Sequence, residues 1–348
     1  MSRAPGDRVA VEDPARFVPM AGPNGVLVVA DPAGVRRLPE GPIASLAQGP
    51  AAWRWLHLDH NRPATHRWLR EGAGLPEASA DELAEAMLAL QTRPRCLRLD
   101  DGVLFIGRGV NLNDQALPED MVSVRAWLTP GRLVTVVRRR LRAAEDLAEW
   151  LDDPARRAAI DHAGALLVRL LEGLLGRMAP IVAEAGEQMD DLLEALLDEQ
   201  RQIDGAQLAR LRLRALTLRR YVLPLREAIE QLRLAPPTLI DPDQHLPLGE
   251  LADDAGRMGD DLHAVATRGE LARGELDSQQ ARVHNGRLYA LAIVTAIFLP
   301  LSFLTGLLGM NVAGVPFTTQ PWAFAFWAAV FAVVLLGQLV LLRRVRWL

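Results

Sequence analysis

The chain has 348 residues, 50% of them hydrophobic, and a formal net charge of −4 at pH 7. That charge excludes the strongly basic field of typical nucleic-acid-binding proteins, so no nucleic acid is expected as a partner. The single cysteine excludes an intrachain disulfide and a cysteine-based metal cage within one chain.

The N-terminal part, residues 1–140, predicts a cytoplasmic α/β domain. Short β-rich runs bounded by Gly, Pro and Asp predict strands at residues 26–29, 53–58, 103–106, 121–128 and 133–137. Residues 129–131 predict a hairpin turn, and residues 80–90 a helix. In the run at 121–128, apolar residues alternate with a second set, Ser123, Arg125 and Trp127.

Residues 141–247 predict a cytoplasmic helical region. Two amphipathic runs, at 166–198 and 207–234, carry leucines at helical spacing, and Pro224 predicts an interruption of the second run. Four prolines between residues 236 and 247 predict a linker. The pattern from 248 to 308 then predicts one continuous stalk helix, on the order of 90 Å long.

Two apolar runs near the C-terminus, residues 288–308 and 322–342, contain no charged side chain. Each has roughly the 20 residues needed to cross a bilayer, so two transmembrane helices are predicted. Arginines precede the first run and follow the second, whereas the loop at 312–321 carries no charge. This asymmetry predicts a multi-pass membrane protein with the loop outside and with the N-terminus and the basic tail, 343–348, in the cytoplasm. The membrane is expected to be the bacterial inner (plasma) membrane.

The first apolar run carries a narrow, weakly polar stripe on a 3.5-residue repeat. Its members, followed from the start of the run, are Leu288, Ala292, Thr295, Leu299, Ser302, Gly306 and Gly309. Hydroxyl groups alternating with apolar constrictions are typical of a pore lining. Small residues at this spacing are equally typical of helix packing in lipid, and both interpretations stay open. Since two spans cannot enclose an aqueous path, a pore would need several copies of the chain.

The sequence at residues 299–311, which ends in Gly309-Met310-Asn311, resembles the signature of the CorA family of divalent-metal transporters. Residues 108–113, 121–128, 138–140 and the loop at 311–316 resemble the zinc-transporter ZntB branch of that family. Ala313 stands where that branch has a glycine, and Met310 matches the magnesium branch. The resemblance implies an α+β membrane protein shaped as a funnel and assembled as a homopentamer in the lipid bilayer. First-span helices, continuing the stalk over 248–311, would line the pore, and Gly309, Met310 and Asn311 would form its selectivity filter.

The metal is expected to be cargo rather than a cofactor. A tetrahedral zinc site needs Cys, His or carboxylate ligands, and neither apolar run contains any. A hydrated ion, most favourably Zn²⁺, is therefore expected at a ring of Asn311 side chains, with Mg²⁺, Co²⁺ and Ni²⁺ discriminated poorly. The alternatives are a Mg²⁺/Co²⁺ channel of the same family and, more remotely, a membrane-tethered scaffold or sensor. An enzyme is not expected, because no phosphate loop, nucleophile elbow or catalytic carboxylate pair is recognised.

Other polar residues are weaker candidates. His284 lies one turn before the first span and is a candidate for the cytoplasmic mouth of the pore. The acidic residues Asp253, Asp254, Asp260 and Asp261, with His263, and a second group, Asp190, Asp191 and Glu194, suggest metal sensing between subunits or an ordinary solvated helix face. The His57-Leu58-Asp59-His60 sequence suggests a metal cluster, but on a strand His60 points away from His57 and Asp59, which favours ordinary surface or turn chemistry.

Overall fold

The fold is described from a computed structural model over residues 25–71, 80–90, 93–197, 204–310, 316–317 and 320–344. The chain forms two compact units, residues 1–272 and 273–348. The boundary between the units falls inside one helix, α8 (His245–Leu308).

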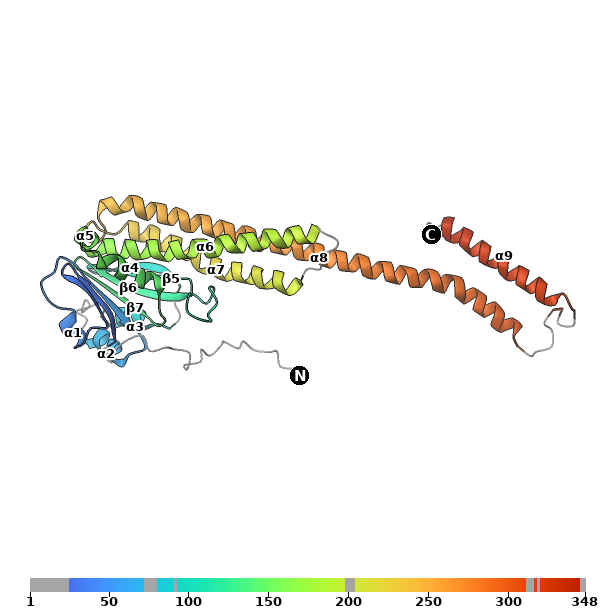
Figure 1. Cartoon of the computed structure of the whole chain (residues 1–348), viewed down its shortest axis with the longest axis horizontal. Coiled ribbons are helices and arrows are strands. Elements are labelled where there is room, and N and C mark those ends of the chain that lie inside the picture. Colours follow the sequence, from blue (N-terminus) through green and yellow to red (C-terminus); the bar gives the residue numbers. More distant parts are fainter. Residues whose placement is uncertain are drawn as a thin grey trace. The chain divides into compact units, whose positions relative to one another are not determined.

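Within the described residues, the first unit is built on a seven-stranded mixed sheet with the strand order β2-β1-β3-β7-β6-β5-β4 (Figure 1). The strands are β1 (Val26–Asp31), β2 (Gly34–Arg37), β3 (Arg54–Asp59), β4 (Arg95–Leu99), β5 (Gly102–Gly109), β6 (Val122–Thr129) and β7 (Arg132–Val137). Neighbouring strands are antiparallel except β3 and β7, which are parallel.

The five predicted strands and the predicted turn between β6 and β7 are confirmed. Two strands were not predicted, β2 and β4, and both lie at the edges of the sheet. Their residues are largely exposed and charged, so they lack the apolar signal that identifies central strands.

Helices cover both faces of the sheet. The first face is covered by α1 (Ile43–Leu46), α2 (Pro63–Glu71) and α3 (Ala80–Leu88). Trp68 of α2 and Met87 of α3 pack there against Leu56, Trp127 and other buried sheet residues. The opposite face is covered by α4 (Arg142–Asp152), α6 (Ala163–Leu197) and α7 (Gly205–Arg233), and a short helix, α5 (Pro154–Ala158), follows α4.

The first part of α8 packs alongside α6 and α7 (Figure 1). Buried apolar residues recur along this part of α8, from Leu248 through Leu262 to Ala272. Close approach to α7 occurs at Gly259, where an added Cβ would lie 2.7 Å from a methyl carbon of Leu223. Arg268 of α8 is also 2.8 Å from Asp190 of α6. The chain after the sheet is helical, as predicted for residues 141–247 and for the stalk helix.

Two details of the helix predictions were wrong. α7 continues through Pro224 rather than breaking there, and buried residues on both sides, including Val222 and Leu225, hold it in place. Pro224 removes one backbone hydrogen bond, and the packing of the flanking turns compensates for it. α8 begins at His245, three residues before the predicted start, after the 3₁₀ turn η2 (Pro242–Gln244). Pro247 is accommodated in the first turn, where its missing N–H costs no bond.

The second unit contains the C-terminal part of α8 and the helix α9 (Ala323–Arg344). Among the described residues, these are the two helices long and apolar enough to cross a membrane. Of the most apolar window in each helix, the chain itself buries 0% in α8 and 6% in α9. The apolar side chains of both helices therefore need a cover that one chain does not supply. Mixed sheet, long helix and two apolar C-terminal helices confirm the predicted elements of the fold.

Candidate ion path

The stripe predicted to line a pore lies on the continuous helix α8. The helix runs without interruption to Leu308 and passes through Pro300. Its geometry places residues seven apart on one side, so Leu288, Thr295 and Ser302 follow one another along a single face. All seven stripe residues are exposed on the isolated chain, including Ala292, Leu299, Gly306 and Gly309.

Two threonine hydroxyl groups of the span bond within their own helix. Thr295 Oγ1 donates to the carbonyl of Leu291 at 2.9 Å, and Thr305 Oγ1 donates to the carbonyl of Ser302 at 3.0 Å. A hydroxyl group that donates a hydrogen bond to a backbone carbonyl can still accept hydrogen bonds through the lone pairs of its oxygen. Thr295 can therefore accept a hydrogen bond from water around a passing cation. Gly306 adds no bulk, because a Cβ at this position would meet nothing within 4 Å.

The helix ends where the signature begins. The N–H of Gly309 still donates to the carbonyl of Thr305 at 2.9 Å, and the N–H of Met310 lies 3.5 Å from the carbonyl of Leu307. Asn311, the predicted ring residue, lies outside the described residues, as do residues 312–315. Beyond the loop, Phe317, Trp322 and Phe326 form an aromatic cluster at the start of α9, with ring centroids 4.9–5.9 Å apart.

The other candidates on α8 and α6 lie on exposed surfaces. His284, His263, Asp253, Asp260 and Asp261 are exposed, and Asp254 is partly exposed and paired with Arg257. On α6, Asp191 and Glu194 are exposed, and Asp190 pairs with Arg268. Across the described part of one chain, no three His, Cys, Asp or Glu residues come together as a metal site.

The His57-Leu58-Asp59-His60 sequence is buried rather than exposed. The exposed fractions are 5% for His57, 2% for Asp59 and 6% for His60, because β3 is central and covered on both faces. Each polar group has a local partner: His57 Nδ1 lies 2.8 Å from Thr135 Oγ1, and Asp59 accepts from the N–H of Asn61. His57 therefore joins β3 to β7 inside the sheet, and Asp59 stabilises the turn that follows β3. Of the expected surface or turn chemistry, the surface part was wrong and the turn part is present.

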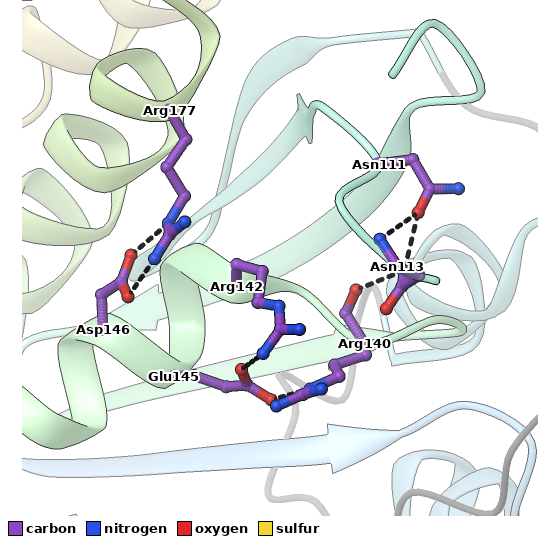
Figure 2. A network of polar contacts seen from close by, with 7 residues as sticks. All are labelled: Asn111, Asn113, Arg140, Arg142, Glu145, Asp146 and Arg177. Carbon is purple, nitrogen blue, oxygen red and sulfur yellow. Dashed lines mark hydrogen bonds and ion pairs between the residues drawn. The ribbon is translucent and has the colours of Figure 1, made fainter. Parts of the chain in front are cut away.

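A polar network joins two of the segments on which the family resemblance depends (Figure 2). Asn113 Nδ2 donates to Asn111 Oδ1 at 2.7 Å and to the carbonyl of Arg140 at 3.1 Å. Glu145 of α4 in turn pairs with Arg140 and Arg142. The loop after β5 is thus tied to the chain that leaves β7.

A second pair in the same view ties α4 to α6. Arg177 approaches both carboxylate oxygens of Asp146, with Nη2 2.5 Å from Oδ1 (Figure 2). Since α6 lies on the sheet, this bidentate pair fixes α4 against the same layer.

Arg125 of β6 was not predicted as a site residue. Its side chain lies inside the fold, with an exposed fraction of 0%. Its Nη2 donates to the carbonyl of Ala89, just after the C-terminal end of α3. The sequence signal that relates to this contact is the C-terminal end of the helix predicted at residues 80–90. The last carbonyl groups of a helix have no partner within the helix and attract cationic side chains.

Comparisons with known proteins agree on one family. Residues 50–344 match the family model described as CorA-like Mg²⁺ transporter protein. The chain is similar to the zinc transport protein ZntB of Yersinia enterocolitica, with 30% identity over 294 residues that cover 84% of this chain and 88% of the relative. It is also similar to the divalent cation transporter CmaX of Pseudomonas aeruginosa, with 34% identity over 319 residues that cover 90% and 93%.

A solved structure supports the same relationship. The structure of full-length CmaX superposes with a TM-score of 0.78 and 33% sequence identity, covering 94% of this chain and 99% of that one. The similarity therefore extends over the sheet, the long helix and the apolar C-terminal helices.

Proposed function

The chain belongs to the CorA family and is a divalent-cation transporter, and from this premise we propose how it carries the ion. Five copies form a homopentamer in the plasma membrane, and the C-terminal part of α8 from each copy lines the pore. A ring of Asn311 side chains selects hydrated divalent cations at the outer end, and Zn²⁺ is the main cargo. The protein is a transporter, not an enzyme.

A pore shared between copies is supported by the exposure of both apolar helices. The chain buries 0% and 6% of their most apolar windows, so the two helices do not enclose a path by themselves. In a closed ring, α8 would exchange part of this exposed surface for contacts with other copies, and α9 would face lipid. The aromatic cluster of Phe317, Trp322 and Phe326 suits the membrane–water interface.

The single observation that carries the proposal is the uncharged stripe on one face of α8, which leads directly into the Gly-Met-Asn sequence. Thr295 and Ser302 offer oxygen atoms to a hydrated ion, while Leu288 and Leu299 narrow the path with apolar side chains. Apolar rings of this kind gate by excluding water when they close. His284, one turn below the stripe, would stand at the cytoplasmic mouth.

Carboxamides suit fast passage of a divalent ion. Their oxygens are neutral, so a ring of Asn311 side chains would hydrogen-bond the water around the ion without trapping it. Gly309 leaves room near the axis, because it has no side chain. The same neutrality gives weak discrimination among Zn²⁺, Mg²⁺, Co²⁺ and Ni²⁺, since no ligand here favours one of them strongly.

Zinc is favoured over magnesium by the relatives. Proteins named as zinc transport protein ZntB match most of the chain at about 30% identity. The orientation in the membrane is a further part of the proposal. Arginines before the first span and at the C-terminal end of the chain, with an uncharged loop between the spans, support an arrangement with both termini in the cytoplasm.

The proposal is tested by flux into proteoliposomes that contain the purified full-length protein and a metal-sensitive dye. We expect Zn²⁺ entry above that of protein-free vesicles, with slower Mg²⁺ entry. Faster Mg²⁺ than Zn²⁺ entry would support the Mg²⁺/Co²⁺ alternative, and absence of flux for every divalent cation would refute transport. Repeating the assay with and without a pH gradient shows whether protons are coupled to the metal.

A further inference from the structure

A groove in the first unit is lined mainly by basic side chains. It has a volume of about 570 Å³ and lies between α2 and the ends of β3 and β7. His60, His66, Arg67, Arg70 and Arg138 line it, and Glu71 is the one carboxylate among the lining residues that the structure describes. None of the predicted ion-path residues belongs to this groove.

The sheet places a further arginine behind this groove. Arg125 of β6 is paired with Val136 of β7, so both side chains lie on the same face of the sheet. Arg138 follows directly after the end of β7, and its charge acts on Arg125. His60 lies beside it, because the N–H of His60 donates to the carbonyl of Val137 at 2.8 Å. Three basic residues, from β6 and from the ends of β3 and β7, therefore lie close together.

Arg125 is buried, and no described carboxylate pairs with it. Its exposed fraction is 0%, and among the described residues its Nε and Nη1 have no hydrogen-bond partner. Burial, followed by the positive charges of Arg138 and Arg108, lowers the pKa of Arg125 to about 10. The guanidinium still carries its charge at neutral pH, and a buried charge without an opposite partner is costly.

The buried side chain of His60 lies near the same positive charges. Its Nε2 donates to the carbonyl of Leu88 at 2.9 Å, and its ring packs edge-on against that of His66, with centroids 4.7 Å apart. Burial lowers the pKa of His60 to about 4, and the charges of His66, Arg125 and Arg138 act in the same direction. The hydrogen bond to Leu88 opposes this shift, and the positive charge at the floor of the groove comes from Arg125 and Arg138.

We propose that this groove binds a small phosphate-bearing anion, with Arg67, Arg70 and Arg138 as its contacts and with the charge of Arg125 behind it. Guanidinium groups match phosphate oxygens in pairs, and several of them favour a multiply charged group such as pyrophosphate. The volume lies within the usual range for small-molecule sites and accommodates a nucleotide. The bound anion supplies the negative charge that Arg125 lacks.

Calorimetric titration of the full-length protein in detergent tests the site, with a chelator present so that divalent metals take no part. Pyrophosphate and ADP are the two probes, and sulfate at equal ionic strength is the reference. We expect both probes to bind more tightly than sulfate. Tighter binding of ADP identifies a nucleotide as the ligand class, and equal binding identifies the diphosphate group alone. No binding of either probe overturns the proposal.

Variants locate the binding in the groove. Arg67 and Arg70 are exposed on α2, so the double variant R67Q/R70Q should fold normally and lose about tenfold in affinity for each arginine. The matched control R156Q/R210Q removes two exposed arginines from other helices and should bind as the wild type does. Wild-type affinity in R67Q/R70Q would overturn the site.

The variant Arg125→Met separates a role in binding from a purely structural one. If Arg125 provides potential for the anion, R125M keeps or raises the melting temperature without ligand, because it removes a buried charge, and it weakens pyrophosphate binding. If Arg125 only caps α3, R125M melts at a lower temperature and binds pyrophosphate as the wild type does, which would contradict its assigned role.

Discussion

The buried imidazole of His57 should make the first unit sensitive to acid. Its side chain lies inside the sheet, where Nδ1 is 2.8 Å from Thr135 Oγ1 and the same hydroxyl accepts from Trp55 Nε1 at 2.9 Å. Burial lowers the pKa of His57 to about 3. The native state therefore holds a neutral imidazole at pH values where the unfolded chain, with an ordinary histidine pKa of about 6.5, already binds a proton.

The sign and size of the effect follow from these two pKa values. Above about pH 6.5 neither state is protonated and His57 costs nothing. Below it, the unfolded state gains free energy from the proton, so the free energy of unfolding falls by about 1.4 kcal/mol per pH unit until the folded pKa is approached. At pH 5 the loss is about 2 kcal/mol, or a fall in melting temperature of about 4–8 °C for a unit of this size.

Thermal unfolding at about pH 7.5 and pH 5 measures the effect. His57→Gln keeps a polar partner for Thr135 but cannot take up the proton, so its melting temperature should fall less on acidification than that of the wild type. Other acid-sensitive groups, His60 among them, are present in both proteins and cancel in the comparison. The control His263→Gln, on the exposed face of α8, keeps the wild-type fall. An equal fall in the wild type and His57→Gln would refute the reasoning.

Two further substitutions test packing and the pore. Gly164→Ala should lower the free energy of unfolding by about 1–3 kcal/mol, because the added Cβ would lie 2.0 Å from the carbonyl oxygen of Leu239. In the control Gly176→Ala the added Cβ meets nothing within 4 Å, so this variant should be neutral or more stable by about 0.5–1 kcal/mol. Denaturant unfolding measures both changes. Leu299→Ser should raise Zn²⁺ flux several-fold, because it makes an apolar constriction polar. The control Leu301→Ser, on the other side of the helix, should leave the flux unchanged. Equal flux in the two variants would contradict the assignment of the pore-lining face.

The central strands and the helices were predictable because their signals are local. β1, β3, β5, β6 and β7 carry dense β-branched and apolar residues, whereas the edge strands β2 and β4 do not, since half of such a strand faces solvent. Continuation of α7 through Pro224 depends on tertiary packing around Val222 and Leu225, which no local pattern contains.

Burial of polar residues was harder to predict than the elements themselves. The sequence favoured surface or turn chemistry for His57 and His60 and assigned no role to Arg125, whereas all three side chains are buried because helices cover both faces of this sheet. Only the strand order shows that His60, Arg125 and Arg138 lie close together. The proposed ion path was hard to predict for another reason. Its walls would come from several copies of the chain, whereas one sequence contains only the stripe from Leu288 to Gly309.

Zinc flux through the variant Asn311→Ala tests the proposed pore most directly. The control Gln320→Ala removes a carboxamide from the same loop outside the signature. Both variants should keep the oligomeric size of the wild type in light scattering. We predict that Asn311→Ala proteoliposomes take up no more Zn²⁺ than protein-free vesicles, while Gln320→Ala transports normally. Wild-type Zn²⁺ uptake by Asn311→Ala would contradict the assignment of Asn311 as the selectivity ring.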